Sequence, residues 1–238
     1  MQSPAEVAAT KLVATNFAQA AGLFDCIWEG SEPADRAKLW QRGLALFFVG
    51  RFAEGSAQFD SDLSSNGGDV EELAWRFCCD LESAVQDGTS RHEAALQAAS
   101  NLCATPMAKP DPRPVMRSIM ELFKDTEALV VAAAAEIAGR IDAVLEAGLA
   151  ASQQPHDGSP LPTGFTSRQM CEDAPAYASY YCALWLHSCF GGGVHNERAL
   201  ELFNQAAAAP SLDFMGLLMA MHAGAPPDLS LIHSESTL

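Results

Sequence analysis

Basic residues are scarce in this sequence, which has 14 Lys and Arg against 30 Asp and Glu and a formal net charge of −16. Such an excess of negative charge repels phosphate backbones and anionic lipid head groups, so nucleic acid is not expected as a partner. An acidic surface commonly serves solubility, and a basic protein partner is the alternative explanation.

Long apolar runs and a leader-like start are also missing. No uninterrupted apolar stretch approaches the ~20 residues of a membrane-spanning helix. The first residues, MQSPAEVAATKL, lack the basic head and apolar core of an uncleaved signal. A transit peptide that had already been removed would leave no trace. We therefore expect no transmembrane segment.

Strand-forming residues are few. Only three Tyr are present, and runs of Val, Ile and Thr are scarce, whereas Ala is abundant. Ala gives up no side-chain entropy in a helix and β-branched residues do, so this composition favours helices. The 238 residues suffice for one core or one extended array of helical units. The expected fold class is all-α.

Cysteine is present in a pattern that argues against disulfides. The number is odd, two cysteines are adjacent, and the chain is too large to need covalent staples. We expect free, mostly buried thiols in a reducing compartment. The seven are Cys26, Cys78, Cys79, Cys103, Cys171, Cys182 and Cys189.

A repeat of 35 residues relates NFAQAAGLFDCIW at 16–28 to RFAEGSAQFDSDL at 51–63. Five pairs of apolar, small or identical residues keep this offset. Spacings of three and four residues place each set on one helical face. The pairs are Phe17 with Phe52, Ala20 with Gly55, Phe24 with Phe59, Asp25 with Asp60, and Trp28 with Leu63.

The helix expected before the second copy ends in a glycine turn. It carries Leu39, Gly43, Leu46 and Phe47, and Gly50 is expected to end it in a left-handed conformation. Gly43 costs about 1 kcal/mol inside a helix. Close backbone approach by the partner helix is the expected compensation. A third, weaker copy at 196–210 repeats the small residue and the Phe; its members are Ala199, Phe203, Ala206 and Pro210.

At these positions the chain resembles the tetratricopeptide repeat family, and in particular a bacterial and plastid-type subgroup of it. Small residues at helix crossings, the turn glycine, the aromatics behind it and the closing Pro210 stand where that family places them. Departures from the pattern are Leu39 in place of the signature Trp, with Trp40 one residue late, and His187 at a small-residue position. The resemblance implies antiparallel helical hairpins in a right-handed α-solenoid.

In that family the first helix of each pair lines the concave face. Carried over to this chain, the resemblance implies partner-binding residues at Trp40, Leu44, Phe47, Phe48, Tyr181 and Leu184. Few Lys, Arg or Asn stand there, so clamping of a terminal carboxylate is not expected. The alternative is that a helix over 70–86, with Leu73, Trp75 and Phe77, fills this apolar groove itself.

The remaining segments fit one helical domain over residues 1–223. Repeats are expected at about 3–35, 36–68 and 176–210, and N-caps at Ser3, Asp69, Ser90 and Asp125. A Pro-rich linker at 103–114 and a long loop at 152–175 interrupt the pattern. The other helices are expected at about 70–86, 91–101, 114–124, 126–151, 175–190, 196–209 and 212–223, with an extended tail at 224–238.

Chemical motifs are weak. Cys182, His187 and Cys189, with His195 as a fourth ligand, have a zinc-like composition, but packed core thiols explain them more simply. FGGGVHN at 190–196 lacks the Lys of a P-loop and is better explained as a turn between helices. The adjacent Cys78 and Cys79 lack a cationic setting beyond Arg76 for a reactive thiol.

The sequence therefore predicts a non-catalytic protein-interaction or scaffold module without a cofactor, as a peripheral subunit or assembly factor of a larger complex. The resemblance points to a plastid, where a photosynthetic membrane complex is one host; the cytoplasm is the alternative. Two other functions stay open. One is a thiol- or metal-dependent enzyme near Cys182, His187 and Cys189, and the other is a homodimerising helical protein.

Overall fold

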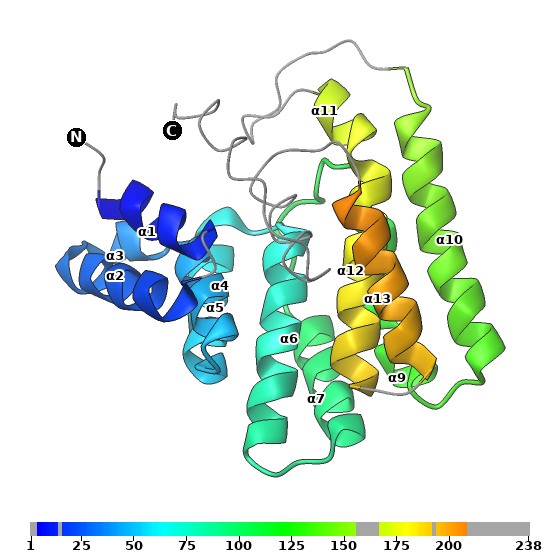
Figure 1. Cartoon of the computed structure of the whole chain (residues 1–238), viewed down its shortest axis with the longest axis horizontal. Coiled ribbons are helices and arrows are strands. Elements are labelled where there is room, and N and C mark those ends of the chain that lie inside the picture. The colour runs from blue at the N-terminus through cyan, green and yellow to red at the C-terminus, as the bar shows by residue number, and fades with distance from the viewer. Residues whose placement is uncertain (1–3, 14–15, 156–166, 192–193, 209–238) are drawn as a thin grey trace.

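The computed structural model describes residues 4–13, 16–155, 167–191 and 194–208, and these contain thirteen helices and no strand (Figure 1). The all-α prediction is confirmed. The helices are α1 (Pro4–Val13), α2 (Phe17–Gly30), α3 (Pro33–Arg36), α4 (Trp40–Phe48), α5 (Phe52–Asn66), α6 (Val70–Gln86), α7 (Arg91–Ala104), α8 (Met116–Lys124), α9 (Thr126–Leu129), α10 (Ala134–Ser152), α11 (Ser167–Glu172), α12 (Ala174–Phe190) and α13 (Val194–Ala207).

Short-range chemistry sets several helix ends. The Asp69 carboxylate accepts the backbone N–H of Glu71, and the Ser90 hydroxyl accepts that of Glu93, so both predicted N-caps are confirmed. Asp125 precedes α9, but α9 has no side-chain capping bond within the described chain. Ser3, the first predicted cap, lies outside the described residues. Gly50 has a φ of 76°, which confirms the left-handed turn between α4 and α5.

Three of the five pairs of the 35-residue repeat are buried to the same degree: the small residues, the second Phe pair and the half-buried first Phe pair. Ala20 and Phe24 of α2 are enclosed to the same degree as Gly55 and Phe59 of α5. Between these two helices lies α4, which packs against both. The third copy keeps the pattern, because Ala199, Phe203 and Ala206 of α13 are also buried.

Gly43 allows a close approach, although the group that approaches it is a side chain. A Cβ added at Gly43 would lie 2.6 Å from Cζ of Phe59. On α5, one turn before Phe59, a Cβ added at Gly55 would lie 3.3 Å from the carbonyl oxygen of Gly43. At the corresponding place in the third copy, the ring of His187 lies 6.5 Å from that of Phe203, edge to face.

Consecutive helices pack on one another along the chain. In the first half α1 packs on α2, α4 on α5, α5 on α6, and α6 on α7. In the second half α12 packs on both α10 and α13, and it also contacts α6, α7 and α8 (Figure 1). Because α12 is covered on all sides, nearly all of its residues are buried.

Two predicted boundaries are wrong. The helix expected over 126–151 is broken into α9 and α10, and Ala133 is extended at the break. The preceding Val130 and Val131 are β-branched, which lowers helix propensity there. The loop expected over 152–175 contains α11 and the start of α12. An Arg168–Glu172 ion pair of 2.7 Å, one helical turn apart, and the buried Met170 support α11.

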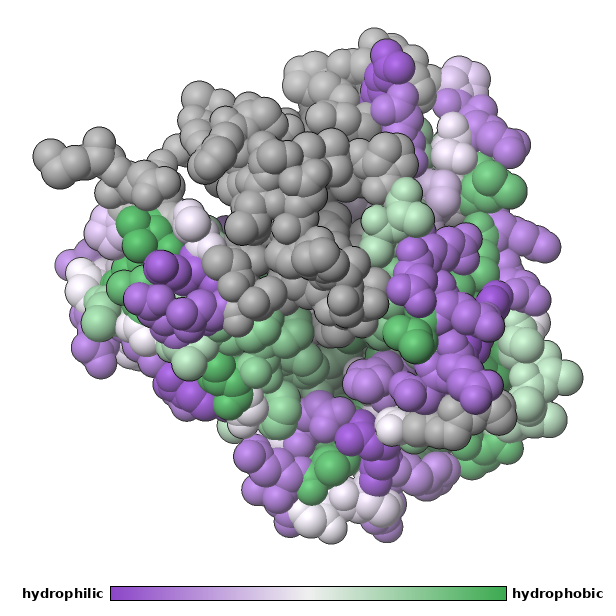
Figure 2. All heavy atoms as spheres, in the orientation of Figure 1, coloured by the Kyte–Doolittle hydropathy of each residue, from purple (hydrophilic) through white to green (hydrophobic). Residues whose placement is uncertain are grey.

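The surface is mostly polar on the face shown in Figure 2, above all over α13, whose Glu197, Arg198 and Glu201 are exposed. Apolar residues reach this face where α4 and α5 lie beside α6. None of the helices in the described ranges combines the length and the apolar character needed to cross a bilayer. The helix expected at 212–223 and the tail at 224–238 lie outside the described residues.

Candidate functional site

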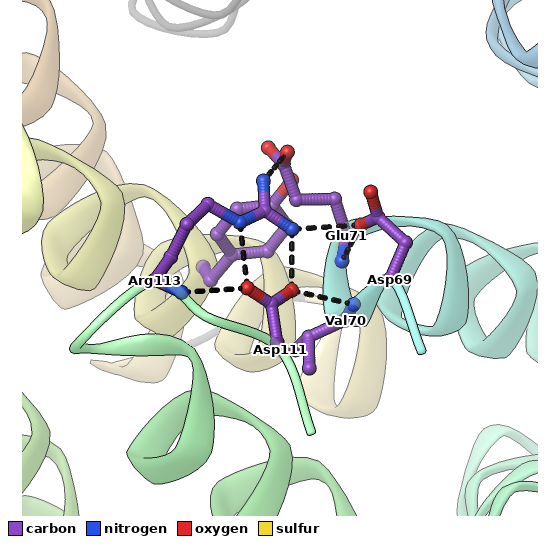
Figure 3. Close-up of polar contacts among 6 residues, drawn as sticks. Asp69, Val70, Glu71, Asp111 and Arg113 are labelled. Carbon is purple, nitrogen blue, oxygen red and sulfur yellow. Dashed lines mark hydrogen bonds and ion pairs between the residues drawn. The ribbon is translucent and has the colours of Figure 1, made fainter. Parts of the chain in front are cut away.

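Among the described residues, a deeply buried group of charges surrounds Arg113, in the segment between α7 and α8 (Figure 3). Arg113 is 6 % exposed. Its Nε donates to Oδ1 of Asp111 at 2.9 Å, and its Nη2 donates to Asp111 at 2.6 Å and to Asp69 at 2.8 Å. Its Nη1 pairs with Glu71. Every guanidinium nitrogen thus has a carboxylate partner.

These contacts join three parts of the chain. Asp69 and Glu71 stand at the start of α6, and Asp111 also accepts the backbone N–H of Val70 at 3.1 Å. From α12, the Tyr181 hydroxyl donates to Glu71 at 2.9 Å. Arg113 therefore fastens the 105–115 segment to the first turn of α6, and Glu71 extends the connection to α12.

The electrostatics of Glu71 are unusual for a carboxylate paired with arginine. Burial raises the pKa of Glu71 to about 7, although Arg113 and the Tyr181 hydroxyl both favour the charged form. The neighbouring Asp69 carboxylate adds to the increase. A carboxyl that titrates near neutrality is a common feature of catalytic sites, but structural ion-pair networks produce it too. For Glu71, the pKa is set by its burial and by three neighbouring side chains, Arg113, Asp69 and Tyr181.

A second pair of carboxyls lies beside this cluster. Asp62 of α5 and Glu72 of α6 are 5 % and 7 % exposed, and the two carboxyls influence each other's pKa. Burial is the main cause that raises the pKa of both groups. Asp69 raises both further, and Glu71 raises that of Glu72. The pair bridges two helices and is as deeply enclosed as Arg113.

The residues of the predicted enzyme site are divided between the core and the surface. Cys182 and Cys189 are buried in α12, and burial raises the pKa of both thiols, so their reactive thiolate forms are disfavoured. His187 is exposed, and its Nδ1 lies 3.3 Å from Oδ1 of Asn196. His195 stacks on Phe190 with 4.3 Å between ring centroids.

The adjacent cysteines of α6 are also enclosed. Cys78 and Cys79 are buried; burial raises the pKa of Cys78 to about 12, and the Ser188 hydroxyl lies 3.3 Å from its sulfur. Within the described ranges, no three His, Cys, Asp or Glu side chains are grouped so that they could hold a metal ion.

The six predicted partner-binding residues fall into two sets. Leu44, Tyr181 and Leu184 are at most 1 % exposed, so they belong to the core and present no surface to a partner in this conformation. The partly buried set is Trp40, Phe47 and Phe48.

Trp75 of α6 lies against this second set. Its ring centroid is 5.2 Å from that of Phe47 and 6.1 Å from that of Phe48. Phe48 also stacks on Phe17 at 4.4 Å. The alternative prediction, that the helix over 70–86 fills the apolar groove, agrees with these contacts.

Sequence reasoning missed both charge clusters. Asp69, Glu71 and Glu72 were visible as carboxylates at a helix start, and Arg113 stood between two prolines in PDPRP, residues 110–114. Those prolines restrict the backbone on each side of the arginine. A conformationally restricted Arg is the one local signal for a fixed ion pair there.

Comparisons with protein-family models, with curated proteins and with solved structures find no match to this chain.

Proposed function

We propose that this protein is a non-catalytic helical scaffold that binds another protein. In this proposal the helix pairs α1–α2, α4–α5 and α12–α13 are hairpins of a tetratricopeptide-like right-handed solenoid. The observation that carries the proposal is the nesting of Gly43 against the ring of Phe59 where α4 crosses α5. Nesting of this kind is how solenoids stack hairpins and create extended binding surfaces.

The apolar area where α4 and α5 lie beside α6 supports a partner surface (Figure 2). Trp40, Phe47 and Phe48 come from α4, and each is partly exposed. Partly exposed aromatic side chains are enriched at the centres of protein interfaces, where they supply much of the binding energy. The chain's acidic surface would then form the rim, and it favours a partner with basic residues around an apolar contact.

Affinity capture of the native complex, with the mass of the intact assembly as readout, tests this function. Wild-type protein should recover one partner in fixed stoichiometry, and Trp40→Ala should lose it while keeping the wild-type circular dichroism spectrum and a cooperative unfolding transition. Leu200→Ala is the matched control, because Leu200 is exposed on α13, away from α4. The proposal fails if Trp40→Ala retains the partner, or if the wild type recovers only further copies of itself, which is the homodimer alternative.

Thiol labelling of the native protein tests the enzyme alternative. The scaffold proposal expects Cys182 and Cys189 to stay unlabelled by an alkylating probe until the chain unfolds, because both thiols are buried. Rapid labelling of either residue in the folded protein would instead support a thiol enzyme.

Membership of a plastid complex follows from the family resemblance alone and is part of this proposal. Immunolocalisation of the endogenous protein tests it directly. Signal that overlaps a plastid marker, and co-migration with a membrane complex in native gels, are the expected results. A cytoplasmic signal would contradict the location without contradicting the scaffold role.

A further inference from the structure

Most of the helix–helix contact between α1–α5 and the later helices that the structure describes is made by one helix pair. Among the described residues, the contact of α1–α5 with the later helices runs mainly through α5 on α6, with a smaller contribution from α4 (Figure 1). A group that stabilises or weakens the packing of α5 on α6 therefore acts on the main described contact between these two parts of the fold.

Asp62 and Glu72 belong to these two helices, and neither forms an ion pair with a Lys, Arg or His in the part of the chain that the structure describes. Arg113 is close by, but its bonds go to Asp69, Glu71 and Asp111. Asp62 Oδ2 and Glu72 Oε2 are buried and find no hydrogen-bond partner among the described residues. An ionised carboxylate is an acceptor only, so a hydrogen bond between two carboxyl groups needs a proton on one of them.

The charged groups that face the pair oppose its ionisation. On α6 these are Asp69 and Glu71, both carboxylates, and their Arg113 partner is shared with Asp111. Three carboxylates around one guanidinium leave the surroundings negative. Tyr181 of α12 is hydrogen-bonded to Glu71. Two more negative charges at Asp62 and Glu72 would be buried, close together and next to this cluster, which is strongly unfavourable.

We propose that Asp62 and Glu72 share one proton, that this proton holds α5 against α6, and that its loss at alkaline pH opens the hinge between the two halves of the protein. With the proton in place the two carboxyls attract each other through a hydrogen bond. Without it they repel across the same contact, and water must enter to solvate them.

The sign of the pH dependence follows from proton counting. The folded chain keeps one proton on the pair through neutral pH, whereas an unfolded chain has released it, because its carboxyls titrate near pH 4. For groups whose folded-state pKa is raised, stability is present at low pH and is lost as the pH rises. Both folding and hinge closure therefore weaken from acid to alkaline pH.

The first test compares unfolding by urea across pH for wild type, Glu72→Gln and Asp62→Asn. Each amide can donate to the remaining carboxylate without a titrating proton. The folding equilibrium constant of the wild type, divided by that of either variant, should fall about tenfold per pH unit between about pH 6.5 and 8. Glu146→Gln, an exposed carboxyl on α10, is the matched control and should keep the wild-type profile.

The second test measures the hinge itself. Cys26 of α2 and Cys103 of α7 are exposed, whereas the other five cysteines are buried, so a donor and an acceptor dye can be attached to the folded protein at these two sites. Energy transfer should change between pH 6 and 9 in the wild type and stay constant in Glu72→Gln. The proposal is overturned by a ratio of folding constants that does not change with pH, or by energy transfer that responds to pH equally in both proteins.

Discussion

Two glycines of α10 offer a matched test of how closely α10 and α12 pack. A Cβ added at Gly148 would lie 2.8 Å from Cβ of Ala178, 2.9 Å from the carbonyl oxygen of Ala174 and 3.2 Å from Cα of Pro175. Two of these three atoms belong to the backbone of α12, so they cannot rotate away. At Gly139, on the same helix, an added Cβ would meet nothing within 4 Å.

Both Gly→Ala changes gain about 1 kcal/mol of helix propensity, because alanine is less flexible than glycine in the unfolded chain. Gly139→Ala should therefore stabilise the protein by about that amount. Gly148→Ala adds a steric penalty of about 1–3 kcal/mol, which is typical for an extra methyl group forced into a packed core. The difference between the two variants is that penalty alone.

Urea denaturation followed by circular dichroism at 222 nm measures the free energy of unfolding of both variants, and Gly139→Ala is the internal control for helix propensity. Gly148→Ala should be less stable than Gly139→Ala by about 1–3 kcal/mol. If the two variants unfold at the same urea concentration with equal slopes, α10 does not approach α12 at this glycine and the packing described for the second half is wrong.

Three further outcomes follow from the core. Phe59→Ala should lose about 3–5 kcal/mol in the same urea assay, since the ring is 1 % exposed, and a smaller loss would mean that Phe59 does not fill the space at Gly43. Alkylation of the folded protein followed by mass spectrometry should label Cys26 and Cys103 and spare the other five cysteines; labelling of all seven at equal rates would contradict their burial. Trp185→Phe removes the 2.9 Å hydrogen bond to Thr126 and should lower the free energy of unfolding by about 1 kcal/mol, whereas an unchanged value would argue against that bond.

Periodicity was sufficient to predict most of the longer helices and the buried positions that the repeat marks on α2, α5 and α13. Phe24 and Phe59 occupy equivalent buried positions because an offset of 35 residues keeps the same helical face directed at α4. The caps at Asp69 and Ser90 were equally predictable, since an N-cap bond spans only two or three residues. Local rules work where the partner is close in sequence.

The charge cluster required information that periodicity does not contain. Glu71 meets Arg113 across 42 residues and Tyr181 across 110, and no local pattern relates residues at such separations. The same limit explains why Leu44 and Tyr181 were expected on an open face. The sequence pattern identifies an apolar helix face, but whether a further helix covers it is decided by the tertiary packing.

The account depends most on the nesting of a small residue of one helix against an aromatic ring of the next, and a double-mutant cycle at Gly43 and Phe59 measures that contact directly. Gly43→Ala should destabilise the wild type, because its Cβ would lie 2.6 Å from the ring of Phe59. In a Phe59→Leu background the same change should be neutral or stabilising, with a coupling energy of about 1 kcal/mol or more. Additive effects of the two substitutions would show that these residues do not touch, and would contradict the account.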